Sequence, residues 1–276
     1  MKIKRGSTLV GCHGKNYTLE KLLRESSTIT EWMGIRSFDQ YTVRVIQFDS
    51  DYLDYMFLQF IYESSLITKL SHKNIIQGLD IMIDKYSCYC ITEFCNNDPY
   101  CASVGDFIEE EVLFLDVIEA TKIILEVAYA LEYLELNNII HGDIRPENIY
   151  YTSGIVKLVN SGFMRKTDGV DLIKECFFIG GVSPYISPDS QESTHSDMYS
   201  LGAMYYHMIV GEVPFPGDNP IDLHIKRLKQ SPQPQRVKPN LPEGVCVIIE
   251  KMMKINPQNR YRSTKHLIVD LKKIIC

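Results

Sequence analysis

The sequence lacks any long uninterrupted apolar stretch. No segment reaches the roughly 18 consecutive apolar residues that a transmembrane helix needs, so we expect no membrane span. The basic N-terminus MKIKRGSTLVGCHG has no continuous apolar core and is therefore unlike a secretory signal. It also lacks the glycine directly after the initiator Met that myristoylation requires. These absences favour a cytoplasmic or otherwise intracellular protein.

The chain also lacks an excess of positive charge, with 29 Lys and Arg against 35 Asp and Glu. The chain has a formal net charge of −6 and a sequence pI near 5.7, whereas nucleic-acid-binding domains are normally basic. We therefore expect no nucleic-acid partner. With 276 residues, of which 45% are hydrophobic, the chain can form one large domain or two lobes with separate cores.

Paired Cys-x-x-Cys knuckles are absent. The eight cysteines are scattered along the chain, which is unlike a disulfide scaffold and favours free intracellular thiols. Cys88 and Cys90 lie in the alternating apolar segment YSCYCITEF, where a free cysteine acts as a small hydrophobic residue. We therefore expect no zinc site and no metal-binding residues.

The sequence predicts a strand-rich part followed by a mostly helical part. Alternation and β-branched residues predict strands at 17–23 and 40–48, and two more within 74–94 on either side of a turn at Asp84 and Lys85. The segment 34–38 could be a strand or its turn. Apolar spacing of three and four residues predicts helices over 53–70, 109–137, 195–211, 221–229, 244–255 and 264–275. Short strands are predicted at 148–152 and 156–160. The change from the strand-rich pattern to the mostly helical one falls near residues 94–103.

One segment carries most of the chemistry: IIHGDIRPENIYY, residues 139–151. HGDIRPEN resembles the catalytic loop H-R-D-L-K-P-E-N of the eukaryotic-type protein kinase family. Four further segments resemble later kinase elements in the correct order: VKLVNSGFMRK, GVSPYISPD, HSDMYSLGAMYYHMIVGEVPF and INPQNRYRS. The resemblance extends from about residue 17 to the C-terminus.

The resemblance implies an α+β, bilobal kinase-like fold. We expect an N-terminal extension at 1–16, a small strand-rich N-lobe with one main helix at 17–95, and a larger, mostly helical C-lobe at 96–276. Asp197, and the pair Asp189 with Arg260, match residues that hold the large lobe together in kinases.

The same resemblance assigns roles within the catalytic loop. Asp143 matches the aspartate that accepts the proton of the substrate hydroxyl, and Asn148 matches a metal-binding amide. Arg145 replaces the lysine that contacts the transferred phosphate, which keeps the charge but changes the donor geometry. Gly142 replaces an arginine that pairs with activation-loop phosphate in many kinases.

The metal-binding and hinge positions depart further from the family. Asn160 replaces the D-F-G aspartate that holds magnesium, so a full negative charge is lost at the metal. Glu93 to Cys95 match the hinge, where backbone groups contact adenine, and Thr92 matches the gatekeeper.

The phosphate-binding strand is also altered. Arg44 aligns with the strand lysine of V-A-I-K, with Gln47 as the alternative register, and Glu63 matches its helix glutamate. An Arg44–Glu63 pair could bind phosphate poorly or could be a purely structural clamp.

The loop that covers the nucleotide phosphates in the kinase family lacks its glycines in this sequence. Arg24, Ser26 and Ile29 take the three glycine positions of the phosphate-covering loop. Glu31 could repel a triphosphate or lie on a solvated strand edge. Trp32 could fill the nucleotide space or cap the N-lobe core.

These losses predict a pseudokinase, a kinase fold that acts by scaffolding or allosteric regulation, with a protein partner such as an active kinase or a kinase substrate. No cofactor is expected, ATP binding is expected to be weak or absent, and magnesium is not expected. Two alternatives remain open: a weakly active serine/threonine kinase, and a nucleotide sensor that works without metal.

Overall fold

The computed structural model describes residues 3–25, 29–49, 55–84, 87–94, 102–109, 116–152, 154–159, 165–166, 183–189, 193–217 and 219–276. The chain divides into two compact units. Unit 1 comprises Met1–Cys101 with Thr152–Phe163, and unit 2 comprises Ala102–Tyr151 with Met164–Cys276. Within the described ranges, every helix is too short or too polar to cross a bilayer.

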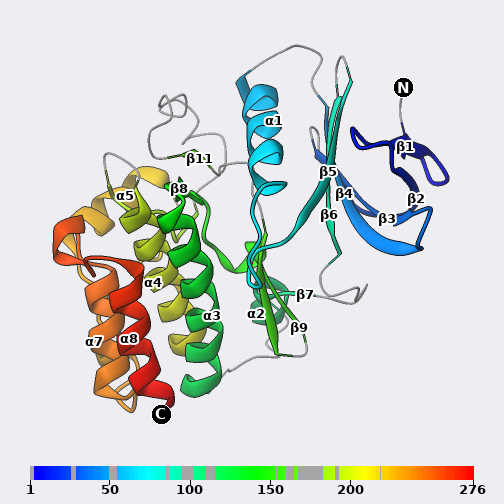
Figure 1. The fold of residues 1–276 in the computed structure, drawn as a ribbon. Coiled ribbons are helices and arrows are strands. Elements are labelled where there is room, and N and C mark those ends of the chain that lie inside the picture. Colours follow the sequence, from blue (N-terminus) through cyan, green and yellow to red (C-terminus); the bar gives the residue numbers. More distant parts are fainter. Residues whose placement is uncertain are drawn as a thin grey trace. The chain divides into compact units, whose positions relative to one another are not determined.

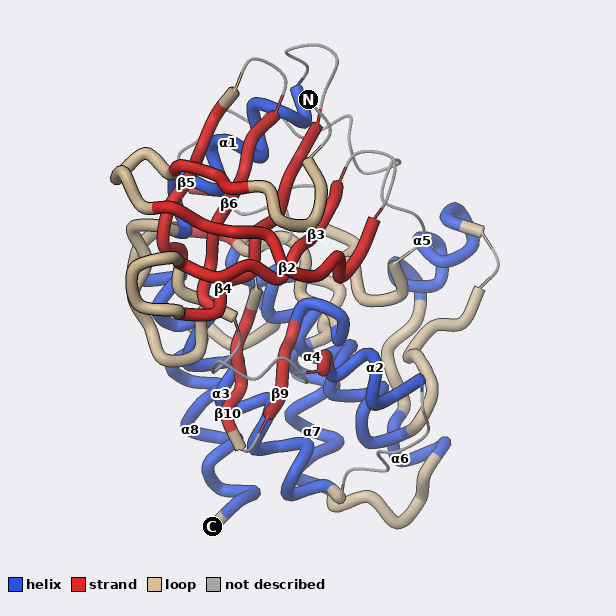
Figure 2. Tube along the Cα trace, turned by 90° about the vertical axis from the view of Figure 1, so that its right-hand side faces the viewer, coloured by secondary structure: helices blue, strands red, loops and turns tan. Residues whose placement is uncertain are grey.

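Unit 1 is built on an antiparallel sheet with the strand order β1-β2-β3-β4-β6-β5 (Figure 1). Its strands are β1 (Thr8–Val10), β2 (Asn16–Glu25), β3 (Ile29–Arg36), β4 (Tyr41–Asp49), β5 (Gly78–Ile83) and β6 (Ser87–Glu93). Two register shifts between β2 and β3 mark bulges, which bend a strand, and Figure 2 shows both strands curving. The helix α1 (Tyr55–Ile67) packs on β4, β5 and β6, and the strand β10 (Ile155–Leu158) also belongs to this unit.

The two faces of this sheet have different characters. Side chains alternate along a strand, so Val43 and Val45 lie on one face of β4 and Arg44 lies on the other. The valine face forms a buried cluster that includes Trp32, which is 7% exposed, and Tyr17. Trp32 is thus a core residue of unit 1, which confirms the second of the two roles expected for it.

Unit 2 is mostly helical. Its helices are α2 (Val104–Glu109), α3 (Val117–Leu136), α4 (Thr194–Val210), α5 (Pro220–Lys229), α6 (Pro234–Val237), α7 (Glu243–Met252) and α8 (Thr264–Ile275). The remaining elements here are the short strands β7 (Ala102–Ser103), β8 (Ile139–Ile140), β9 (Ile149–Thr152) and β11 (Arg165–Lys166), and the 3-10 helices η2 (Pro146–Asn148) and η4 (Pro257–Asn259). Figure 1 shows α3, α4, α7 and α8 side by side, and α4 is buried on most of its surface.

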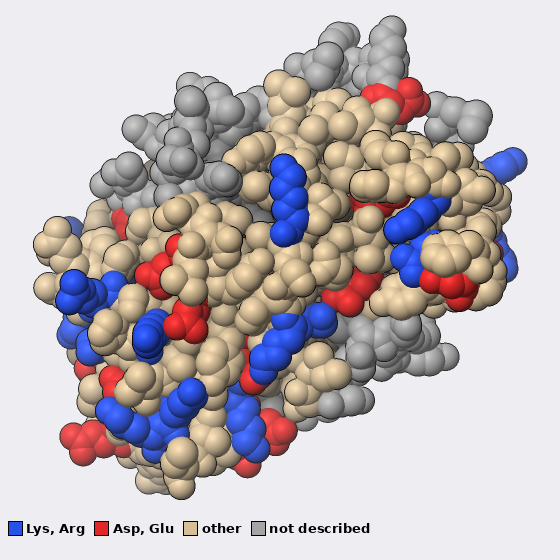
Figure 3. Space-filling view, viewed as in Figure 1, with Lys and Arg blue, Asp and Glu red and all other residues tan. Residues whose placement is uncertain are grey.

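The exposed surface around the last helices carries several lysines. Lys265, Lys272 and Lys273 are exposed on α8, and Lys254 is exposed just after α7. Figure 3 shows basic side chains, interspersed with acidic ones, over the part of unit 2 where α7 and α8 lie. The surface charge there is mixed rather than of one sign.

The expected α+β architecture, with a small strand-rich part and a larger helical part, is confirmed. The open alternative at 34–38 is resolved as both: β3 continues to Arg36 and a turn follows. The single helix predicted over 109–137 is wrong at its start. Asp116 adopts an extended backbone and its side chain accepts from the backbone N–H of Glu119 at 2.8 Å, so α3 begins at Val117.

Candidate active site

A buried carboxylate holds the loop that carries the catalytic motif. Asp197, on α4, accepts a backbone N–H from His141 and another from Gly142, both at 2.8 Å. Gly142 has a φ of +80°, a left-handed conformation in which a glycine is favoured over the arginine of the family pattern. Two charge-assisted hydrogen bonds that this one carboxylate accepts therefore fix the backbone just before Asp143. Asp197 has the anchoring role expected from the sequence.

Asp143 and Asn148 are brought together at the two ends of this loop. The side-chain amide of Asn148 donates to the Asp143 carboxylate at 2.7 Å and to its backbone carbonyl at 2.9 Å. Asn148 ends the 3-10 helix η2, in which Pro146 at the first position pre-sets the backbone. The loop is thereby closed on itself, with the carboxylate held by a neutral donor.

Arg145 lies beside the same carboxylate. Its Nε is 3.2 Å from Oδ2 of Asp143 and 3.8 Å from Oε2 of Glu147. Burial raises the pKa of Asp143 above its ordinary value, while the Arg145 charge and the Asn148 hydrogen bond act in the opposite direction. All three predicted loop residues therefore meet around one partly desolvated carboxyl group.

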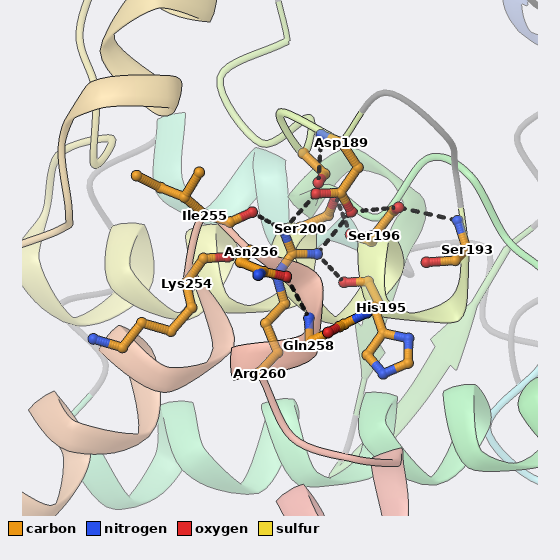
Figure 4. Close-up of polar contacts among 11 residues, drawn as sticks. Asp189, Ser193, His195, Ser196, Ser200, Lys254, Ile255, Asn256, Gln258 and Arg260 are labelled. Atoms are coloured by element: carbon orange, nitrogen blue, oxygen red, sulfur yellow. Dashed lines mark hydrogen bonds and ion pairs between the residues drawn. The ribbon is translucent and has the colours of Figure 1, made fainter.

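A buried ion pair anchors the segment 183–189. Residues of this segment line a small pocket together with Gly142 and Asp143 of the catalytic-motif loop. Arg260 and Asp189 form a bidentate pair, with Nη2–Oδ1 at 2.6 Å and Nη1–Oδ2 at 2.8 Å (Figure 4). The remaining guanidinium donors reach the backbone carbonyls of Lys254, His195 and Ile255. Every N–H of this buried arginine thus has an acceptor, which satisfies its charge and donors together. The pairing expected from the sequence is confirmed.

Two further contacts hold segment 183–189, and neither was predicted from the sequence. Arg227, a buried residue of α5, donates from Nη2 to the backbone carbonyl of Ser183 at 2.6 Å, and burial lowers its pKa. The Tyr185 hydroxyl and Nδ1 of His207 are 2.7 Å apart. Ser183 lines a small pocket that also includes Asp143. Helices α4 and α5 thus position the backbone next to the candidate base.

In unit 1, Arg44 lies opposite Thr92 in the pairing of β4 with β6. Its Nη2 donates to Oε2 of Glu31 on the neighbouring strand β3 at 2.6 Å, and both side chains are 14% exposed. Glu31 is therefore neither solvated nor on a strand edge, and that alternative is wrong, because β3 lies between β2 and β4. Gln47, the alternative register, is buried and donates to Asp49.

Glu63 is fully buried on α1. Cys90 lies on β6, one of the strands that α1 packs against. Burial raises the pKa of Cys88 and of Cys90 to about 12, so both are neutral thiols in the sheet, where the sequence predicted small hydrophobic residues. An Arg44–Glu63 pair stays a prediction.

The side chain of Glu93, at the end of β6, has a structural task. Its Oε1 accepts from Lys157 of β10 at 2.6 Å and from the backbone N–H of Gln77 at 3.0 Å. These contacts join three segments of unit 1. They were not predicted, because nothing in the sequence of any of the three segments indicates which residues pair. Cys95, Asn160 and Ser26 lie outside the described residues.

A metal would find few protein ligands here. Among the described residues, no group of three or more His, Cys, Asp or Glu side chains is placed to hold an ion. The Nδ2 of Asn148 is used on Asp143, which leaves its Oδ1 as the oxygen that could face a cation. The residues fit a magnesium ion that is held mainly by substrate phosphates and water, as is common for this ion.

Comparisons with known proteins identify the family of this chain. A family model described as the protein kinase domain matches residues 25–270. A probable serine/threonine-protein kinase of Clostridium perfringens is 32% identical over 218 residues, covering 77% of this chain and 31% of that protein. The serine/threonine-protein kinase PknB of Mycobacterium leprae is 25% identical over 253 residues, covering 87% of this chain and 39% of that protein. A probable PknB of Lactococcus lactis is 24% identical over 235 residues, covering 83% and 36%.

These relatives correct the expected function. The chain was expected to be a pseudokinase, but the proteins it resembles across most of its length are named as serine/threonine-protein kinases. The alternative of a weakly active kinase fits these relatives better. The chain spans about a third of the length of the curated relatives it matches. The family model covers well over half of the chain, so the chain belongs to the protein kinase family.

Proposed function

We propose that this chain is a serine/threonine protein kinase, which transfers the terminal phosphoryl group of ATP to a hydroxyl group of a protein. The observation that supports the proposal most is the Asp143 carboxylate, held by Asn148 and flanked by Arg145. A positioned carboxylate is the group that phosphoryl transfer to an alcohol needs on the acceptor side.

Asp143 would orient the acceptor hydroxyl and take its proton. As the oxygen attacks phosphorus, the bond between the terminal phosphorus and the bridging oxygen breaks, and ADP leaves with the electron pair. Burial raises the pKa of Asp143, which makes its carboxylate a better proton acceptor than that of an exposed aspartate. Arg145, next to it, would stabilise charge on the transferred group.

The nucleotide would be bound by unit 1. Arg44 supplies the positive charge for phosphate, with Glu63 as the expected helix partner, and backbone groups from Glu93 to Cys95 contact the base. A bound magnesium ion would neutralise phosphate charge, and the family resemblance alone assigns Asn148 and Asn160 as the amides that would hold it. Since two amides replace the usual mixture of amide and carboxylate, metal and nucleotide are expected to bind more weakly than in most kinases.

The rate should be low for the same reason. Losing one preorganised charged or polar group commonly costs on the order of a hundredfold in rate, and several such losses are not simply additive. A slow enzyme with the usual base is therefore the expected behaviour.

The role of the base can be tested by replacing it. Phosphate transfer from labelled ATP to general serine- and threonine-containing substrates should fall on the order of 10²- to 10⁴-fold in Asp143→Asn. Asp222→Asn, on the exposed side of α5, is a matched control that should keep the full rate. Equal rates in wild type and Asp143→Asn would show that Asp143 is not the base.

A further inference from the structure

We propose that Glu31 is a gate on the phosphate-binding arginine: a nucleotide must displace Glu31 from Arg44 in order to bind. This inference rests on the proposed use of Arg44 for phosphate. It concerns a carboxylate that the family resemblance gave no role other than repulsion.

The geometry of the sheet fixes the contact. In the pairing of β3 with β4, Arg44 lies opposite Met33 and Glu31 lies opposite Ile46. Glu31 is therefore a diagonal neighbour of Arg44 on the same face, within reach of a long side chain. The 2.6 Å bond joins two side chains that are each 14% exposed, so water screens the pair less than it would on an open surface.

The Glu31–Arg44 ion pair competes with phosphate for the same guanidinium group. A carboxylate and a phosphate oxygen make the same kind of charge-assisted hydrogen bond to a guanidinium. The phosphate must therefore replace a bond that already exists.

The gate lowers affinity by a predictable factor. A hydrogen bond to a charged group typically contributes enough to change an equilibrium constant on the order of tenfold. Glu31→Gln keeps the shape and an amide oxygen for Arg44 but removes the negative charge. It should bind ADP or a non-hydrolysable ATP analogue, each with Mg²⁺, on the order of ten times more tightly than wild type.

A double-mutant cycle measured by isothermal titration calorimetry tests the mechanism. Arg44→Met should weaken binding, and Glu31→Gln added to Arg44→Met should change nothing further, because the gate acts only through Arg44. Asp39→Asn, which breaks the Arg36–Asp39 ion pair at the other end of β3, is the matched control and should bind like wild type. Glu31→Thr, with a β-branched residue suited to a strand, serves as a second variant if Glu31→Gln unfolds.

Three results would overturn the gate. Affinity could be unchanged in Glu31→Gln, the gain could be as large with Arg44→Met as without it, or nucleotide could bind to none of the variants. An equal gain with and without Arg44→Met would mean that Glu31 repels the nucleotide phosphates directly rather than by occupying Arg44.

The calorimetric readout needs no turnover, so the gate and the kinase activity can fail separately. Phosphate transfer without a Glu31 effect would refute the gate alone. Tighter binding to Glu31→Gln without any Asp143-dependent transfer would refute the proposed function alone.

Discussion

The side-chain amide of Asn148 donates to both the carboxylate and the backbone carbonyl of Asp143, at 2.7 and 2.9 Å. One neutral group thus orients the candidate base, lowers its pKa and closes the loop that carries it. The base depends on this contact because burial alone disfavours its charged form.

Removing that amide should change both the rate and its pH dependence. In Asn148→Ala the rate should fall on the order of tenfold or more, because the variant loses both the hydrogen bond that orients Asp143 and the amide oxygen that could bind a metal ion. The acidic limb of the profile of kcat/KM against pH should move to higher pH, because the hydrogen bond that lowers the pKa of Asp143 is gone. Asn240→Ala, at an exposed position, is the control. An unshifted acidic limb would show that Asn148 does not act through Asp143.

The raised pKa of Asp143 also predicts a trade of stability against activity. Its folded-state pKa lies above the unfolded value, so its stabilising contribution is complete below the unfolded pKa and is lost as the pH rises through the folded pKa. Asp143→Asn stays neutral and should therefore have a higher Tm than wild type at pH 7. The difference should vanish near pH 3, as measured by thermal unfolding across this range. A lower Tm for the variant at pH 7 would contradict this account.

The Asp189–Arg260 pair should be among the most sensitive positions of unit 2. Arg260→Met leaves a buried carboxylate without its partner, which should lower the free energy of unfolding by roughly 3–5 kcal/mol. Lys273→Met, which breaks an exposed pair with Asp270, should cost less than about 1 kcal/mol. Urea unfolding of both variants makes the comparison. Similar losses in the two would mean that burial does not set the strength of these pairs.

Arg227 should affect the protein substrate more than the nucleotide. Arg227→Met removes the donor to the Ser183 carbonyl, which lies beside the pocket that contains Asp143. A displacement of this backbone should raise KM for a protein substrate on the order of tenfold, with KM for ATP unchanged. Steady-state kinetics with each substrate varied in turn would measure this. A parallel rise in both KM values would point to a general loss of structure instead.

Much of the architecture was predictable from local patterns. The three-to-four spacing of apolar residues in α7 and α8 indicated these helices, because one buried face repeats along each of them. The start of α3 was missed since the acidic run before it resembled a helix N-terminus, whereas Asp116 is the residue that caps the helix.

The side-chain pairings within the candidate site were harder to predict from the sequence. Asp189 with Arg260 followed from a family motif, but Glu31 with Arg44 depends on the register between two strands. The contacts of Lys157 with Glu93 and of Arg227 with Ser183 join segments far apart in sequence. No periodicity or motif encodes such a pair, because it is created only when the tertiary fold brings the segments together.

The most direct test is the transfer of labelled phosphate from ATP by the purified wild-type chain, followed by identification of the amino acid that carries the label. A slow serine/threonine kinase should turn over repeatedly, with more than one phosphate transferred per chain and the label on serine or threonine. A chain that transfers no phosphate to any protein hydroxyl, under conditions where nucleotide is bound, would contradict it.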